Sequence, residues 1–244
     1  MKLLAVDTAT ESCGVALTEG ETLRAEITAV SRQTHSRRLM EMIRRALDMA
    51  GWSLNDLDGF VAARGPGGFT GLRIGISTVK GLCTAVERPL VGISNLEGLA
   101  RQAPVRDGAV CAWIDARRNE VFCCRYRYED GILRKETPED ALPPAAALSA
   151  MDAPCLFIGN GAALYRRVIQ ETLGDKARFA PPETHVLRAS TLAFMGLERL
   201  AKNDSDDPVR FAPHYIRKSD ARLPGTVPNK TGAVPNKKGT PHFT

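Results

Sequence analysis

The alternation of apolar and polar positions predicts three neighbouring strands at the start of the chain. The apolar run KLLAV ends at Asp7, and residues 13–29 continue as two strand-like runs on either side of Glu19-Gly20-Glu21. A glycine between polar residues favours a tight turn, so residues 13–29 are expected to form a β-hairpin.

A similar unit returns in the middle of the chain. Residues 109–115 (AVCAWID) are again an apolar run that ends in an aspartate, Asp115, and the strand-like residues after it turn at Asp130-Gly131. Two strand–aspartate–hairpin units in one chain indicate an internal duplication. We therefore expect two related lobes.

The segments between and after these units show strand and helix patterns in alternation. Apolar residues recur with helical spacing over 34–50, and Gly51 follows as a stop signal. Further strands are expected at 58–64, 89–93 and 154–158, and further helices at 71–86, 94–103, 161–173 and 189–203. The order β-β-β-α-β-α-β-α in the first half predicts an α/β fold with helices packed on a mixed sheet. The expected domains are 1–103 (completed by helix 189–203), 104–188, a C-terminal helix and terminal segment at 189–220, and a tail at 221–244.

Net charge changes this picture only at the C-terminus. A charge of +5 and a pI near 9.0 are typical of proteins that bind nucleic acid. However, the tail 221–244 holds the repeated motif VPNK, four basic residues and no acid, so most of the net charge belongs to it. Its Pro-, Gly- and Lys-rich composition predicts disorder.

Composition otherwise describes an ordinary globular protein. Hydrophobic residues make up 43% and charged residues 25% of the chain, and no apolar run is long enough to span a bilayer. The N-terminus does not resemble a signal peptide, so a cytoplasmic protein is expected. The six cysteines contain no C-x-x-C pair, and we expect them to be reduced, mostly buried thiols.

The glycine-rich stretch RGPGGFTGLRIG, residues 64–75, raises the question of phosphate binding. Helix N-termini after glycine loops bind anions through their unpaired N–H groups. No Gly-Lys-Ser/Thr follows these glycines, and the dinucleotide pattern is matched only loosely. We therefore favour a tight turn followed by a closely packed helix, in which Gly71 and Gly75 let helix 71–86 approach a neighbouring element. A residual phosphate contact at Gly65 and Gly67 is the alternative.

The first strand end is a second candidate for nucleotide binding. Asp7, Thr8 and Thr10 could hold the metal and phosphates of a nucleotide. Alternatively, these side chains satisfy backbone groups of the hairpin.

Four segments together resemble the TsaB family, formerly called YeaZ and often labelled glycoprotease-like. They are DTATESCGVAL, RGPGGFTGLRIG, IDARRNEV at 114–121 and PHYIRKSDA at 213–221, and the resemblance covers residues 1 to about 221. It implies the actin-like ATPase fold with two RNase H-like lobes. It also implies a role in making N6-threonylcarbamoyladenosine, in which TsaD transfers threonylcarbamoyl from threonylcarbamoyl-AMP to the adenosine 3′ of the anticodon, in tRNAs reading codons that start with A.

The same resemblance implies a subunit without a catalytic or metal site of its own. TsaD holds its metal with an H-x-x-x-H pair, and the corresponding positions here are Asn95, whose neutral amide is a poor donor for a transition metal, and Leu99, which cannot ligate. The four histidines lack metal-binding spacing, and no H-E-x-x-H or G-x-S-x-G occurs. We expect a chain that is inactive alone, with at most ATP or ADP at a subunit interface.

Function is therefore expected in an interface. Arg38, Met42, Arg45 and Met49 lie together on one flank of helix 36–50, and methionines beside arginines form an adaptable contact surface. A partly buried flank of one domain is the alternative. Helix 71–86, with Gly71 and Gly75 at its start, would pack alongside. The expected partners are TsaD in a heterodimer, TsaE in a ternary complex, a second copy when the chain is alone, and tRNA only through the complex, with no membrane contact.

Two other functions remain as alternatives. Asp7, Thr8, Thr10 and the glycine loop would suit a stand-alone small-molecule kinase of the acetate-kinase type. The glycoprotease label would suit a peptidase acting on TsaD, although no nucleophile–base pair supports it.

Overall fold

The computed structural model describes residues 1–30, 35–149 and 151–217 of the chain. Its first sheet has the strand order β3-β2-β1-β4-β5. These strands are β1 Lys2–Asp7, β2 Ser12–Glu19, β3 Thr22–Val30, β4 Gly59–Gly65 and β5 Leu90–Ser94. β1 pairs antiparallel with β2 and parallel with β4, so the sheet is mixed, as predicted.

The second sheet repeats this arrangement. Its order is β11-β10-β6-β7-β8, with β9 paired to β7. The strands are β6 Gly108–Arg117, β7 Glu120–Glu129, β8 Ile132–Lys135, β9 Asp140–Leu142, β10 Cys155–Ile158 and β11 Ala177–Phe179. β6 pairs antiparallel with β7 and parallel with β10, as β1 does with β2 and β4. The duplicated unit and its two hairpins are confirmed.

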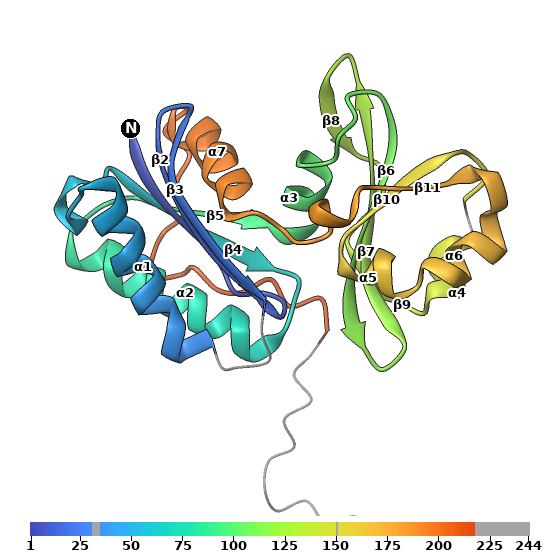
Figure 1. The fold of residues 1–244 in the computed structure, drawn as a ribbon, viewed down its shortest axis with the longest axis horizontal. Coiled ribbons are helices and arrows are strands. Elements are labelled where there is room, and N and C mark those ends of the chain that lie inside the picture. Colours follow the sequence, from blue (N-terminus) through green and yellow to red (C-terminus); the bar gives the residue numbers. More distant parts are fainter. Residues whose placement is uncertain (31–34, 150, 218–244) are drawn as a thin grey trace, which may run out of the picture.

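Helices cover both faces of the first sheet (Figure 1). α1 His35–Ala50 and α2 Phe69–Ala85 pack on one face, and α7 Ala189–Leu200 packs on the other. The alternation of β1 explains this division: Leu4 and Val6 belong to the core with α1 and α2, whereas Leu3 and Ala5 belong to the core with α7.

α3, Asn95–Arg101, joins the two lobes. It follows β5 of the first sheet and packs on β6 and β7 of the second. One hydrophobic cluster consequently includes Val61 and Leu96 together with Ile114 and Tyr126. The lobes share buried apolar surface instead of meeting only through polar side chains.

The helices of the second lobe are short, and one prediction about them is wrong. They are α4 Pro144–Leu148, α5 Asn160–Leu164 and α6 Arg166–Leu173. Short 3-10 turns lie at Gly174–Lys176 and Pro182–Thr184 on either side of β11, and another lies at Leu54–Asp56 in the first lobe. The single helix expected at 161–173 is broken at Tyr165, whose φ and ψ of −99° and 19° are not helical.

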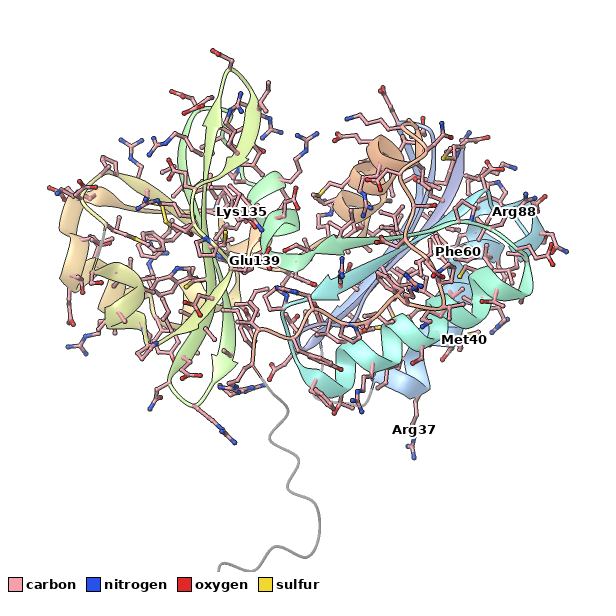
Figure 2. All side chains as sticks on the ribbon, turned by 180° about the vertical axis from the view of Figure 1, so that it is seen from behind. Arg37, Met40, Phe60, Arg88, Lys135 and Glu139 are labelled. Carbon is pink, nitrogen blue, oxygen red and sulfur yellow. A yellow bond between two sulfur atoms is a disulfide. The ribbon has the colours of Figure 1, made fainter. Side chains whose placement is uncertain are left out.

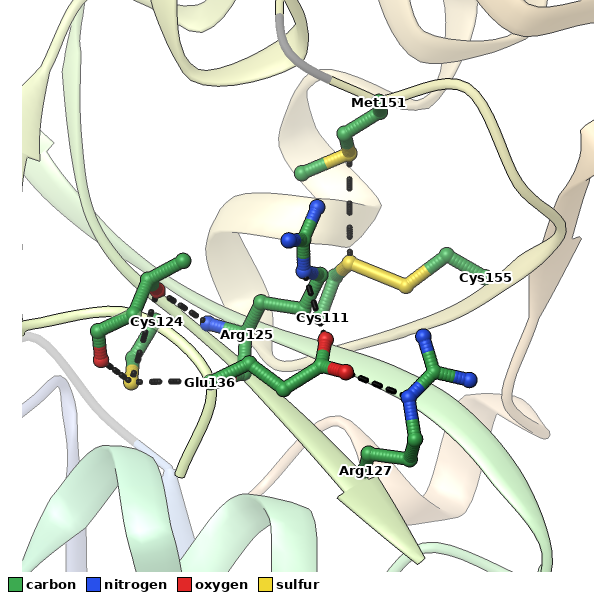
Figure 3. The surroundings of a disulfide bond; sticks show 8 residues. Cys111, Cys124, Arg125, Arg127, Glu136, Met151 and Cys155 are labelled. Carbon is green, nitrogen blue, oxygen red and sulfur yellow. Dashed lines mark hydrogen bonds and ion pairs between the residues drawn. A yellow bond between two sulfur atoms is a disulfide. The ribbon is translucent and has the colours of Figure 1, made fainter. Parts of the chain in front are cut away.

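The prediction that all cysteines are reduced is also wrong. Cys111 on β6 and Cys155 on β10 form a disulfide with a Cα–Cα distance of 6.3 Å (Figure 3). The strands pair in parallel with Cys155 opposite Ala109, which brings the two sulfurs together from positions 44 residues apart. Cys13, Cys83, Cys123 and Cys124 are buried thiols.

Two expectations concern membranes and the tail. Over the described ranges, no helix is both long enough and apolar enough to cross a bilayer. The tail expected at 221–244 lies outside the described residues.

Candidate functional site

A cavity of about 510 Å³ lies between the two lobes, and we call it the cleft. It is bounded by the loop after β1, the glycine loop, the end of β6, the start of α5 and the terminal segment. The lining residues are Ala9, Thr10, Glu11, Pro66, Gly67, Gly68, Phe69, Asp115, Ala116, Arg117, Phe122, Asn160, Leu164, His214, Tyr215, Ile216 and Arg217. The strand-end segments after Asp7 and at Asp115, which the duplication singled out, therefore meet at one cleft.

Asp7 is fully buried beneath the cleft and does not line it. Its Oδ1 accepts hydrogen bonds from the Ala9 N–H and from the Asn95 side-chain amide, both at 3.0 Å. The Asn95 Oδ1 in turn accepts from the Gly65 N–H at 2.8 Å. Asp7 thus belongs to a buried network that ties β1 to β4 and to the start of α3.

The two threonines differ in position. The Thr8 hydroxyl, which is buried, donates to the Gly71 carbonyl at 2.7 Å. Thr10 lines the cleft, and its hydroxyl shares a hydrogen bond with the Ser12 hydroxyl at 2.8 Å. The structure therefore brings Thr10, but not Thr8, to the cleft.

The glycine loop packs tightly against the loop after β1. The Gly68 N–H donates to the Ala9 carbonyl at 2.6 Å, and a Cβ on Gly67 would lie 2.4 Å from the same oxygen. The Gly65 N–H is already bonded to Asn95. These contacts give the loop a close-packing role, as the sequence predicted from the missing Gly-Lys-Ser/Thr motif. The N–H groups of Gly65 and Gly68, which a phosphate would need as donors, are already hydrogen-bonded within the protein.

An ion pair joins the two strand-end loops across the cleft. The Arg117 guanidinium donates to the Glu11 carboxylate at 2.8 Å, and the hydrogen bond to Glu11, with the charge of Asp115, raises the pKa of Arg117. Arg217 closes the same end of the cleft by donating to Glu120 at 2.5 Å and to the Ala116 carbonyl at 3.2 Å. Sequence reasoning missed the cleft residues of 214–217, because this extended segment has no periodicity.

A second cavity of about 500 Å³ is lined by His214 together with Arg64, Ser94, Lys135 and Glu139. Glu139 is nearly buried and accepts from the Ser94 hydroxyl at 2.6 Å and from the Lys135 ammonium at 3.1 Å (Figure 2). The His214 imidazole lies 3.4 Å from the other Glu139 oxygen. Burial raises the pKa of Glu97, which also lines this cavity. These contacts connect the lobes.

Asn95 and Leu99, which the resemblance led us to expect at the metal-ligand positions, do not fit a metal. Asn95 is fully buried and uses both ends of its amide in the network with Asp7 and Gly65. Leu99 is 1% exposed and belongs to the core shared by the lobes. Across the residues that the structure describes, no three His, Cys, Asp or Glu side chains are grouped so that they could hold a metal.

The expected interface residues divide into two groups. Met49 is 68% exposed, and Arg45 is exposed and paired with Glu41. Met42 is only 6% exposed, because it belongs to the core beneath α1, so its predicted surface position is wrong. Arg38 is half-buried. Met40, labelled in Figure 2, is 51% exposed on the same helix and was not predicted from the sequence.

The close packing predicted at Gly71 and Gly75 is confirmed, but their predicted place in a partner interface is wrong. Both are buried, and a Cβ on Gly75 would lie 2.3 Å from the Thr8 hydroxyl oxygen. They admit the loop after β1 of this chain, so they do not lie on a surface open to a partner.

Two lobes with related mixed sheets and a cleft between them define an actin-like ATPase fold. At 12% identity, the ethanolamine utilization protein EutJ from Carboxydothermus hydrogenoformans has the same fold, with a TM-score of 0.52 over 80% of this chain and 90% of that one. YeaZ from Pseudomonas aeruginosa is far more similar: 33% identity and a TM-score of 0.76 over 88% of this chain and 99% of that one.

The sequence comparisons agree with this structural likeness. The family model described as TsaD, tRNA N6-adenosine threonylcarbamoyltransferase, matches residues 23–224. The tRNA threonylcarbamoyladenosine biosynthesis protein TsaB of Bacillus subtilis is 33% identical over 224 residues, which cover 91% of this chain and 96% of that protein. The chain belongs to the TsaB family of tRNA threonylcarbamoyladenosine biosynthesis proteins.

Proposed function

We propose that this chain is a non-catalytic subunit of the complex that transfers threonylcarbamoyl to N6 of an adenosine in tRNA. Membership of the TsaB family implies a complex with a TsaD-related protein. In the proposal TsaD carries the active site, TsaE joins the ternary complex, and this chain is inactive alone. The tRNA substrates are those that read codons starting with A.

The observation that carries this proposal is the pair Asn95 and Leu99. Where TsaD has metal-binding histidines, this chain has an amide committed to Asp7 and Gly65 and a buried leucine in the core. A transition metal needs donors such as imidazole or carboxylate with an open coordination position. These residues instead stabilise the junction of the lobes.

The proposed partner surface is the outer face of α1. Met40 and Met49 are exposed at its two edges, and the ion pairs of Arg45 with Glu41 and of Arg44 with Asp48 lie between them. Exposed methionines among charged pairs suit a contact that can adapt to TsaD or, in its absence, to a second copy of the chain.

Reconstitution tests the function. Threonylcarbamoylation of a tRNA transcript by TsaD and TsaE, supplied with threonylcarbamoyl-AMP, should require this chain, and Asp7→Ala, if folded, should leave the product yield largely intact. Full product formation without the chain would refute the proposal.

The surface needs its own test. Met49→Glu should weaken association with TsaD in size-exclusion chromatography, because a charge would be placed in an apolar contact. Ile132→Glu is the matched control, because Ile132 is 56% exposed on the other lobe. Equal loss of association for both variants would contradict the assignment to α1.

A stand-alone kinase is less well supported by the same geometry. Asp7 is buried, Thr8 is bonded to Gly71, and the N–H groups of Gly65 and Gly68 are already engaged. Calorimetry of the isolated chain with Mg-ATP separates the two: tight binding with turnover would favour the kinase. Any ATP or ADP contact is proposed only at the subunit interface.

A further inference from the structure

An aromatic stack stands at one side of the cleft mouth. The rings of Phe69 and Tyr215 lie parallel within 25°, with centroids 4.9 Å apart. The Arg73 guanidinium lies 3.9 Å from the Phe69 ring centre, and its Nε donates to the Tyr215 hydroxyl at 3.0 Å. Tyr215 lines the cleft and remains 38% exposed. The stack therefore holds an accessible aromatic ring in a fixed orientation.

The hairpin turn between β6 and β7 adjoins the cleft through Arg117. Arg117, Arg118 and Asn119 have φ angles of 62°, 54° and 59°. Arg118 and Asn119 are the two central residues of the hairpin, and the turn that best joins two antiparallel strands requires positive φ at both. Arg117 lines the cleft, where Glu11 holds its side chain, and the exposed Arg118 is the next residue of the turn.

The charges around the mouth are mixed. Arg117 and Arg217 line the cleft together with Glu11 and Asp115, and Arg217 is paired with Glu120. A strong net attraction for phosphate is therefore absent from these lining groups, and the aromatic ring is the larger source of affinity. The chain continues after Arg217 into residues 218–244, whose sequence has five basic residues and one acid.

We propose that this rim (Phe69, Arg73, Arg117, Arg118, Tyr215 and Arg217) binds an unpaired nucleotide of the substrate tRNA directly. The base stacks on Tyr215, and one or two phosphates face the arginines. Unpaired bases in RNA loops and ends are recognised by aromatic stacking and by arginine, whereas bases inside a duplex do not offer their faces. The inference rests on the proposed function, which supplies tRNA as the substrate of the complex.

Fluorescence anisotropy with the full-length chain and a labelled, unmodified tRNA transcript tests this rim. Tyr215→Ala should weaken binding at least five-fold, the lower end of about 1–3 kcal/mol for one stacked base. Tyr215→Phe keeps the ring and should stay within two-fold of the parent. Arg134→Ala is the control for loss of one arginine, because Arg134 is exposed and ion-paired to Glu129 on the far strand β8.

Charge reversal on the turn gives a second test that does not depend on Tyr215. Arg118→Glu should weaken tRNA binding, and the salt dependence of the parent should correspond to about two phosphates, with a slope near −1.4. Thermal unfolding establishes that each variant is folded. Unchanged affinity in both Tyr215→Ala and Arg118→Glu would overturn the proposal, as would equal binding of a blunt RNA duplex.

Competition separates tRNA from a free nucleotide at the same rim. If ADP at millimolar concentration displaces the tRNA and its own binding is lost in Tyr215→Ala, the rim is a mononucleotide site and the tRNA proposal fails. Reconstitution distinguishes a failure of this inference from a failure of the proposed function. If the chain is required for tRNA modification but the rim variants bind tRNA as tightly as the parent, only this inference is refuted.

Discussion

Gly75 and Gly81 lie in the same helix but differ in what surrounds them. A Cβ at Gly75 would lie 2.3 Å from the Thr8 hydroxyl oxygen, whereas a Cβ at Gly81 would have no atom within 4 Å. Alanine gains up to about 1 kcal/mol over glycine in a helix interior, so Gly81→Ala should raise the free energy of unfolding. Gly75→Ala should lower it by about 1–3 kcal/mol, because Thr8 must move and lose its bond to Gly71.

Chemical denaturation with urea measures both variants. The two substitutions change the same residue type in the same helix, so the difference between them isolates the contact with Thr8. A stabilised Gly75→Ala variant would show that the loop after β1 shifts at no cost, and that Gly75 has no packing role.

His185 gives the stability a dependence on pH. Its Nδ1 accepts a hydrogen bond from the Gly159 N–H at 3.1 Å, and burial, the largest cause, lowers the pKa of this imidazole below 6.5. The folded state therefore binds fewer protons than the unfolded state, so His185 contributes stability above about pH 6.5 that is lost as the pH falls further. His185→Asn keeps an acceptor without the titration.

Thermal unfolding between pH 5 and pH 7 checks this sign. The parent should lose stability faster than His185→Asn as the solution becomes more acidic. Parallel pH profiles for the two proteins would exclude His185 as a contributor.

At the scale of elements, the disulfide sets the second lobe apart from the first. It links β6 to β10 across 44 residues, and such a cross-link stabilises a protein by about 2–4 kcal/mol. The denatured, unreduced chain should therefore react with a thiol reagent at four cysteines, and at six after reduction. Cys111→Ala should lower the stability by this amount and expose Cys155 as a fifth thiol.

Cys83→Ala controls the count, because Cys83 is a buried thiol without a disulfide partner. It should remove one reactive thiol from the unreduced chain. Six reactive cysteines in the unreduced parent would contradict the bond.

The elements show which features could be predicted from the sequence. Both hairpins are correct, because their turns carry glycines: Gly20 and Gly131 have φ angles of 55° and 74°. Local residue types determine such turns. The break at Tyr165 and the disulfide depend on packing between distant segments, which leaves no local pattern.

The candidate site divides in the same way. The aspartates at the two strand ends identified the cleft region, because each precedes a loop that lines it. Met42 was misplaced, because α1 packs against both the sheet and α2, so its buried face is wider than one stripe. Tyr215 and Arg217 could not be placed, because an extended segment shows no periodicity from which its contacts follow.

At the scale of the whole molecule, the lobes should unfold together. Their shared core joins residues of both sheets through α3, and Leu99 packs beside Gly159 of the second lobe. Ion pairs and hydrogen bonds at Glu11, Glu120 and Glu139 add contacts between segments on either side of the cleft. Lobes that share buried apolar surface lose it together, which makes unfolding cooperative.

The two tryptophans allow this to be measured. Trp52 packs against the first-lobe core with α1 and α2, and Trp113 is fully buried in the core of the second lobe. The Trp113→Phe variant keeps Trp52, whose fluorescence reports the first lobe, and the Trp52→Phe variant keeps Trp113, which reports the second lobe. Within each variant, the urea midpoint from tryptophan fluorescence should equal the midpoint from far-UV circular dichroism. Leu148, 2% exposed, belongs to the second-lobe cluster, and Leu148→Ala should cost about 2–5 kcal/mol. Added to Trp113→Phe, it should lower the midpoint seen by Trp52 as well, whereas an unmoved Trp52 transition would mean that the lobes unfold separately.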